Sequence, residues 1–201
     1  MVDRRRDALR FEIELTEIAP RVWREIVVPA RFSFWDLHVA IQDAMGWQDS
    51  HLHSFRGVRI SGDDSCWVGI PDEEDWEGLP PTLPGWHVPL LEHFRMPGDV
   101  AEYEYDFGDS WLHVVTLTAI ERRVKGAPYP CCTGGARACP PEDCGGVPGY
   151  AQLLDALLDP HHPEHEEIMA WIPCGWGPET FRAEEVRFDN PGLRWKHAFL
   201  C

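Results

Sequence analysis

Two stretches near the start of the chain alternate apolar and polar side chains with a period of two residues. Residues 10–19 read RFEIELTEIA, and residues 21–28 read RVWREIVV. A period of two places the apolar side chains of each stretch on one face of a β-strand, which for the second stretch puts Arg24 on the same face as its apolar neighbours. We therefore predict two adjacent strands, each with one buried face, joined near Ala19-Pro20.

A helix is predicted directly after this pair of strands. The apolar side chains of the segment FWDLHVAIQDAMGW recur at helical spacing, and Gly46 supplies a stop. Ser33 stands where a helix N-cap is expected, with Asp36 three residues later in the arrangement of a capping box.

The clearest hairpin signal lies in the middle of the chain. Residues 101–107 read AEYEYDF and residues 111–124 read WLHVVTLTAIERRV, with only Gly-Asp-Ser between them. Short turns of this composition between alternating apolar runs join antiparallel strands. A weaker alternation, SHLHSFRGVRI at residues 50–60, predicts one more strand.

The remaining segments complete an α+β plan. Residues 61–98 are acidic and rich in Pro and Gly, and we interpret them as an excursion between core elements. Three segments near the end predict helices, at residues 149–159, 163–172 and 177–188. We expect one domain over residues 1–201: an antiparallel sheet, one helix from the N-terminal half packed on it, and two or three helices grouped at the C-terminal end.

Charge and hydropathy narrow the class of partner. The net charge is −16, which disfavours bulk non-specific binding of nucleic acid, although 16 of the 18 basic residues are arginine and a local arginine patch stays open. No apolar run approaches the length of a membrane span, and no apolar stretch typical of a signal peptide follows the first residues. We expect a cytoplasmic protein with no membrane partner. The charge and hydropathy are compatible with a protein partner.

The hairpin segment DFGDSWLH carries three candidate catalytic residues. Asp106, Asp109 and His113 could bind a divalent metal or act as an acid–base pair. The alternative is structural, with the two carboxylates capping turn amides and the imidazole lying on the strand. Likewise, His51 and His53 in WQDSHLHSF could reach one metal from one strand face, or could be polar residues on a solvated face.

Four of the seven cysteines lie in YPCCTGGARACPPEDCGGVPGY, residues 129–150. Prolines and glycines there predict a stiff loop without regular structure. Because adjacent cysteines project apart, the zinc site that fits this spacing uses Cys132, Cys139 and Cys144, with His51 or His53 as a fourth ligand. Two alternatives remain open: a structural loop with reduced thiols, and a redox or catalytic cysteine, which neighbouring carboxylates disfavour by raising the thiol pKa.

Several spaced motifs resemble those of the plasmid pRiA4b ORF-3-like family. They include APRVWREIVVP, FWDLHVAIQDAMGWQDSHLHSF, YEYDFGDSWLHVVTL, the cysteine stretch, LLDPHHPEHEEIMAWI and GPETFRAEEV, in that order. The resemblance implies an α+β fold in a bacterial or archaeal protein and an association with mobile elements, in some cases under the label of resolvase. None of the six serines sits in an arginine-rich nucleophile motif, so serine-resolvase activity is disfavoured.

Two hypotheses follow for function. The first is a non-enzymatic binding or adaptor domain associated with mobile elements. The second is a metal-dependent enzyme whose site combines the DFGDSWLH hairpin, the His51–His53 strand and the cysteine loop. The second hypothesis predicts that these groups converge in space.

Overall fold

The computed structural model describes residues 2–60, 66–71 and 80–200. These residues build one eight-stranded sheet with the order β5-β4-β3-β6-β7-β1-β2-β8. All neighbouring strands are antiparallel except β4 and β5, which are parallel. The strands are β1 (Asp7–Leu15), β2 (Val22–Pro29), β3 (His53–Arg56), β4 (Trp67–Gly69), β5 (Thr82–Pro84), β6 (Val100–Tyr105), β7 (Trp111–Arg122) and β8 (Cys131–Ala136).

The first two predicted strands are confirmed as β1 and β2, which pair along their whole length. Their inner faces are buried, with Phe11, Ile13, Val22 and Ile26 wholly inaccessible to solvent, and Arg24 lies on the same buried face as expected. The predicted hairpin is confirmed as β6 and β7. The period of two was informative here because one face of the sheet packs on the core while the other is largely polar.

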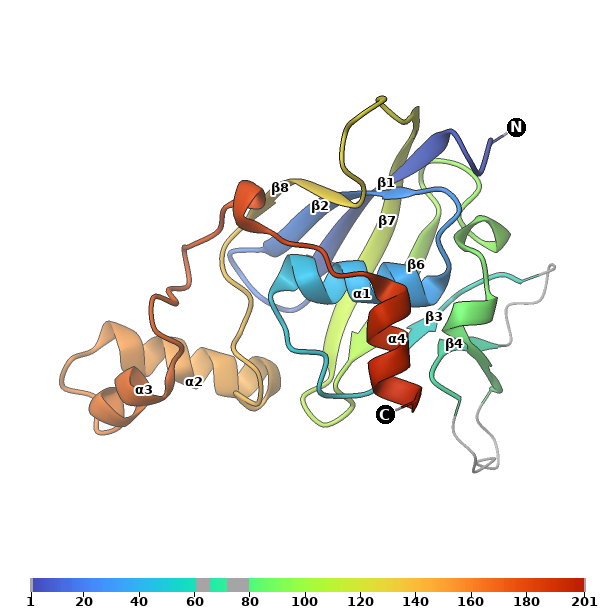
Figure 1. Cartoon of the computed structure of the whole chain (residues 1–201). Coiled ribbons are helices and arrows are strands. Elements are labelled where there is room, and N and C mark those ends of the chain that lie inside the picture. Colours follow the sequence, from blue (N-terminus) through green and yellow to red (C-terminus); the bar gives the residue numbers. More distant parts are fainter. Residues whose placement is uncertain (1, 61–65, 72–79, 201) are drawn as a thin grey trace.

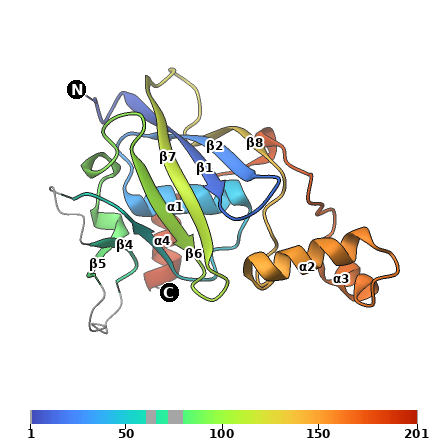
Figure 2. The same cartoon turned by 180° about the vertical axis from the view of Figure 1, so that it is seen from behind.

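Helix α1 (Phe34–Met45) lies across one face of the sheet (Figure 1), and the view from behind places the strands in front of it (Figure 2). The predicted capping box is present: the Ser33 hydroxyl accepts from the Asp36 amide, and the Asp36 carboxylate accepts from the Ser33 amide. Gly46 ends the helix in a left-handed conformation with φ of 91°. These caps fix both ends of the helix that carries His38 and Gln42.

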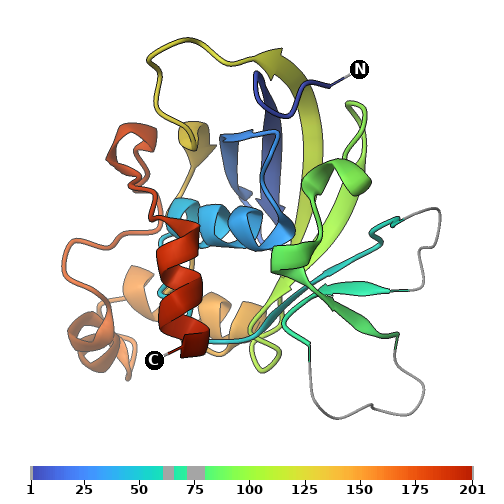
Figure 3. The same cartoon turned by 45° about the vertical axis from the view of Figure 1, so that its right-hand side comes forward.

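The described part of the acidic segment contributes two strands to the sheet. Strands β4 and β5 and two short 3-10 turns, Gly85–His87 and Leu90–Glu92, fall within it. Figure 3 shows these strands extending the sheet beyond β3. The rest of the predicted excursion, residues 61–65 and 72–79, lies outside the described residues.

Two predictions about the second half need correction. The cysteine stretch is not wholly irregular, since β8 pairs with β2 at the edge of the sheet. Gly134 and Gly135 are tolerated there because an edge strand can pair through its backbone alone. At position 135 glycine also avoids a steric clash, because a Cβ there would collide with the Phe181 ring. The helix predicted at residues 177–188 is only a 3-10 turn, Ala183–Glu185.

Three helices lie toward the C-terminus: α2 (Gly146–Leu158), α3 (His165–Trp171) and α4 (Pro191–Leu200). The first two match predicted helices, whereas α4 was not predicted. Helices α2 and α3 stand beside the sheet, while α4 packs on α1 (Figures 1 and 3). Among the described residues, none of these helices is long and apolar enough to cross a membrane.

Candidate functional site

Three segments that are far apart in the sequence meet at the end of the sheet where β6 turns into β7, the lower end in Figure 1. They are the loop between α1 and β3, the β6–β7 turn, and the part of the cysteine loop that precedes α2. The Asp106 amide donates to the Leu52 carbonyl over 2.9 Å, and the Gly145 amide donates to the Asp109 carboxylate over 3.1 Å. The Trp47 indole donates to the Pro140 carbonyl over 2.9 Å. Each segment is therefore tied to the others by hydrogen bonds.

The junction brings one imidazole and several carboxylates together. His51 Nε2 lies 3.0 Å from Asp143 Oδ1, 3.6 Å from Asp106 Oδ2 and 3.9 Å from Glu142 Oε2. Ligand atoms of His51, Asp106 and Asp143 all lie within 4.8 Å of one another. Four ligands at about 2.0–2.2 Å around a tetrahedral ion are about 3.3–3.6 Å apart, so the spacing of this set suits a small divalent ion.

Local backbone structure aims these side chains at one point. Asp106 has a φ of 57°, and its Oδ1 accepts from the Gly108 amide at 2.9 Å, which leaves Oδ2 toward His51. Glu142 Oε1 accepts from the Gln48 amide at 2.7 Å and from the Tyr105 hydroxyl at 3.0 Å, which leaves Oε2 toward the same imidazole. Burial, followed by the Glu142 charge, raises the pKa of Tyr105, so this hydroxyl remains a donor.

The three hairpin candidates separate in space. Asp106 belongs to the cluster around His51, whereas Asp109 holds the Gly145 amide at the start of α2. His113 is buried on β7, where its Nδ1 donates to the Tyr103 carbonyl at 3.2 Å. Burial lowers the pKa of His113 to about 4. The contacts of all three residues thus agree with the structural alternative, and Asp106 in addition faces the cluster around His51.

His51 and His53 also have different surroundings. His51 is partly exposed in the loop before β3, whereas His53 is 2% exposed and stacks on His38 with ring centroids 3.4 Å apart. Burial, followed by the charge on His38, holds the pKa of His53 well below its usual value. Neither nitrogen of His53 has a hydrogen-bond partner among the described residues. The solvated-face interpretation is therefore wrong for His53.

The cysteine loop supplies carboxylates to the cluster. Among the described residues, Cys132, Cys139 and Cys144 do not gather with either histidine into a set of ligand atoms within 4.8 Å. The Cys139 thiol is buried against Met45, with sulfur atoms 3.3 Å apart. Burial raises the pKa of Cys139 to about 12, and burial with the nearby Asp109 charge does the same for Cys144. These thiols favour the protonated form in the absence of metal, so a zinc ion bound here would have to displace their protons.

Comparison with known proteins found a matching family model and similar proteins. Residues 7–185 match the model of the plasmid pRiA4b ORF-3-like protein family. The chain belongs to the plasmid pRiA4b ORF-3-like family. It is 37% identical over 168 residues to the uncharacterized protein y4hQ of Sinorhizobium fredii, covering 83% of this chain and 80% of that one. It is also similar to the crystal structure of MM3350, a protein of unknown function from Methanosarcina mazei, with a TM-score of 0.81 and 36% identity over 91% of this chain and 99% of that chain.

Sequence reasoning missed two members of the cluster around His51. Glu142 and Asp143 were considered only for their effect on the pKa of Cys144. Their position in PPEDCGG could have identified them, because a Pro-Pro pair and two glycines restrict the path of the backbone on either side of these two carboxylates. Asp143 has a φ of 56°, a conformation that Asp adopts more readily than most residues and that turns its carboxylate toward His51.

Proposed function

We propose that this family member is a non-enzymatic binding domain that holds a divalent metal ion through His51, Asp106 and Asp143. The observation that carries the proposal is the meeting of these three ligand atoms from three distant segments. An adaptor role associated with mobile elements is part of the proposal and rests on family membership alone.

The ligand set favours zinc over magnesium or calcium. Zinc accepts a mixture of imidazole nitrogen and carboxylate oxygen, whereas magnesium and calcium prefer oxygen alone. A divalent cation would also offset the repulsion among Asp106, Asp143 and Glu142 in a chain whose net charge is −16. Cysteine ligation at Cys132, Cys139 and Cys144 stays a prediction, and the metal measurement below includes it.

The exposure of the cluster supports binding over catalysis. The side chain of Asp143 is 71% exposed and that of His51 is 30% exposed, so water reaches the ion from one side. Catalytic centres usually exclude bulk water, which strengthens their electrostatic interactions. A metal at this place would instead tie the β6–β7 turn to the cysteine loop and to the loop after α1.

A metal-dependent enzyme is the second candidate, and one observation favours it. Three protein ligands leave a fourth tetrahedral position, which in catalytic zinc sites holds a reactive water. Glu142 Oε2 lies 3.9 Å from His51 Nε2 and could act there as a base or as a further ligand. If the zinc-loaded protein hydrolyses p-nitrophenyl phosphate or acetate and His51→Ala abolishes this, the enzyme hypothesis replaces the binding hypothesis.

Metal content of the purified protein tests the site. After loading with zinc and removal of the excess, we expect one equivalent per chain, measured by inductively coupled plasma mass spectrometry. His51→Ala and Asp143→Ala should lower the content below about a tenth of an equivalent, because each removes one of three ligands. The exposed His161, changed to Ala, is the matched control and should leave the content unchanged.

The cysteine variants separate the two metal hypotheses. Cys139→Ser and Cys144→Ser should retain the full equivalent if the carboxylate cluster binds the ion. Loss of metal in these variants together with retention in His51→Ala and Asp143→Ala would refute the proposed site and support ligation by thiolates.

A further inference from the structure

A basic hollow lies where the start of β1 meets the end of β7. It has a volume of about 730 Å³, and its lining includes Arg5, Arg6, Arg122, Arg123 and Lys125. The antiparallel pairing of β1 with β7 brings these two arginine pairs together, and the Arg123 amide donates to the Arg6 carbonyl over 2.8 Å. In Figure 1 this region lies at the top, near the N-terminus.

Much of the positive charge in this hollow is not neutralised. Arg122 lies 2.9 Å from Asp7, and Arg6 lies 3.8 Å from Asp3. Within the described ranges, no carboxylate forms an ion pair with Arg5, Arg123 or Lys125.

The Arg123 guanidinium lies 5.0 Å from the centre of the Tyr129 ring, and its buried Nε has no hydrogen-bond partner among the described residues. Five cations in the hollow face two paired carboxylates, which leaves an excess of three positive charges.

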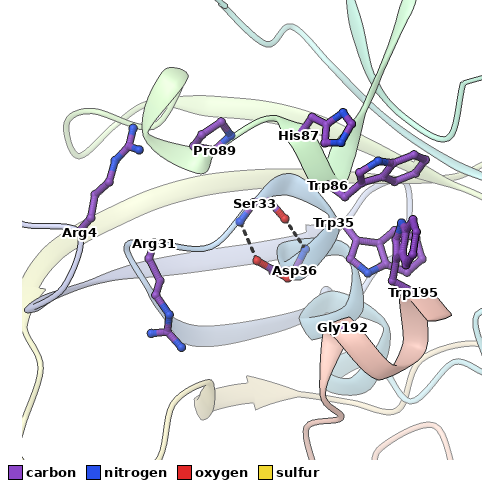
Figure 4. A pocket seen from close by; sticks show the side chains of 10 residues that line it. All are labelled: Arg4, Arg31, Ser33, Trp35, Asp36, Trp86, His87, Pro89, Gly192 and Trp195. Atoms are coloured by element: carbon purple, nitrogen blue, oxygen red, sulfur yellow. Dashed lines mark hydrogen bonds between the residues drawn. The ribbon is translucent and has the colours of Figure 1, made fainter.

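An aromatic pocket is lined at one end by Arg4, the residue before Arg5 of this hollow. It has a volume of about 370 Å³, and Figure 4 shows Arg4 and Arg31 at one end of it and Trp86 and Trp195 at the other. The two indole rings lie 5.9 Å apart at 68°, and both are only half-buried. Arg4 of this pocket directly precedes Arg5 of the basic hollow, so their Cα atoms are about 3.8 Å apart and a single extended strand could follow the chain from one depression to the other.

A pocket with guanidinium groups at one end and half-buried indole rings at the other matches the chemistry of a single nucleic-acid strand. Arginine binds phosphate oxygens in a bidentate manner, and an unpaired base can stack on an indole ring without regard to its sequence. Bases in a duplex are already stacked and cannot enter such a pocket. We propose that this surface binds single-stranded nucleic acid, with phosphates in the basic hollow and a base against Trp86 and Trp195.

The net charge of −16 does not oppose this binding at physiological salt. The Debye length is then about 8 Å, so carboxylates on other faces of the molecule are largely screened. The local excess of three charges sets the salt dependence. For a single strand, the logarithm of affinity should fall with the logarithm of salt concentration with a slope of about −2.

Fluorescence anisotropy with a labelled oligothymidylate of about ten nucleotides tests the proposal. The double variant Arg5→Glu/Lys125→Glu should weaken binding more than about tenfold, because it reverses two of the three unpaired charges. The matched control is Arg182→Glu/Arg187→Glu, which changes the net charge equally at exposed positions far along the chain and should alter affinity less than about twofold. A chelator in every buffer removes any contribution from the proposed metal site, so each proposal can fail independently.

The indole rings require their own variants. Trp86→Leu and Trp195→Leu should each weaken binding about tenfold, as expected for the loss of one stacked base. Equal weakening by the two charge-reversal variants would overturn the proposal. So would binding of a duplex or of inorganic polyphosphate as tight as that of the single strand, with no effect of either tryptophan variant.

Discussion

Lowering the pH from 7 to 5 is expected to reduce the free energy of unfolding by about 2 kcal/mol through His113 and to reduce it further through His53. Both imidazoles are almost wholly buried, at 2% and 1% exposure. Burial lowers both pKa values, to about 4 for His113 and to well below the usual value for His53. This is the largest effect that we expect from a change in solution conditions.

The sign follows from counting protons. In the unfolded chain both imidazoles have a pKa near 6.5, so they bind protons as the pH falls below that value. In the folded protein His113 stays neutral down to about pH 4, and burial keeps the pKa of His53 well below its usual value. The unfolded state therefore binds more protons throughout the range from about pH 6.5 to 4, and stability falls as the pH falls.

His53→Phe gives the sharpest test of this prediction. Neither ring nitrogen of His53 has a partner among the described residues, so a phenyl ring loses no hydrogen bond there and can still stack on His38. Urea unfolding of His53→Phe at pH 7, 6 and 5 in the presence of a chelator should show a smaller pH dependence than that of the parent, with the contribution of His113 remaining. His161→Gln, a change at an exposed position, should retain all of it. A His53→Phe protein with the full pH dependence would contradict the assignment.

The first half of the fold could be predicted because its signals are local. The period of two in β1 and β2, the capping box at Ser33 and the turn between β6 and β7 each depend on residues close in sequence. Helix α4 gave no such signal. Its short apolar stripe is explained only by distant partners, since Trp195 and Phe199 pack on Trp86 with ring centroids 5.9 and 5.0 Å apart.

The candidate site was predicted as a meeting of three segments that included Asp106 and His51, but with cysteines in the place of Asp143. The hairpin, the histidine segment and the cysteine loop do converge, at Asp106, His51 and Asp143. The cysteines drew the prediction toward zinc–thiolate chemistry, because spacing alone does not show which way a side chain points. Packing decides this: Cys139 turns toward Met45 in the core, while Asp143 turns outward.

Arg24→Met is expected to lower the free energy of unfolding by about 2–4 kcal/mol. Arg24 is 1% exposed at the centre of three elements, and burial lowers its pKa. Its guanidinium donates to the carbonyls of Ala44 at the end of α1, Trp23 on β2 and Ala136 on β8, over 2.8, 2.8 and 3.1 Å.

The cost of this change comes from the carbonyl groups that remain. Replacing a whole buried ion pair with apolar side chains can be neutral, but here only the cation is removed, and one buried and two partly buried carbonyls lose a charged donor. The guanidinium also lies 3.8 Å from the centre of the Phe181 ring, which anchors the segment before α4. Arg24→Lys should fall between the parent and Arg24→Met, because an ammonium group keeps the charge but loses the planar fork that reaches several acceptors at once.

Arg21→Met provides the matched control three residues earlier. Its guanidinium is 44% exposed and pairs with Glu12 and Glu14 at 2.8 and 2.9 Å. Exposed pairs of this kind contribute about 0–1 kcal/mol, so urea unfolding should show a small change. Equal losses in Arg21→Met and Arg24→Met would mean that the buried guanidinium does not join α1 to the sheet. A large loss confined to Arg24→Met would show that this one polar side chain, on the apolar face of β2, holds α1 and the edge strand β8 in place.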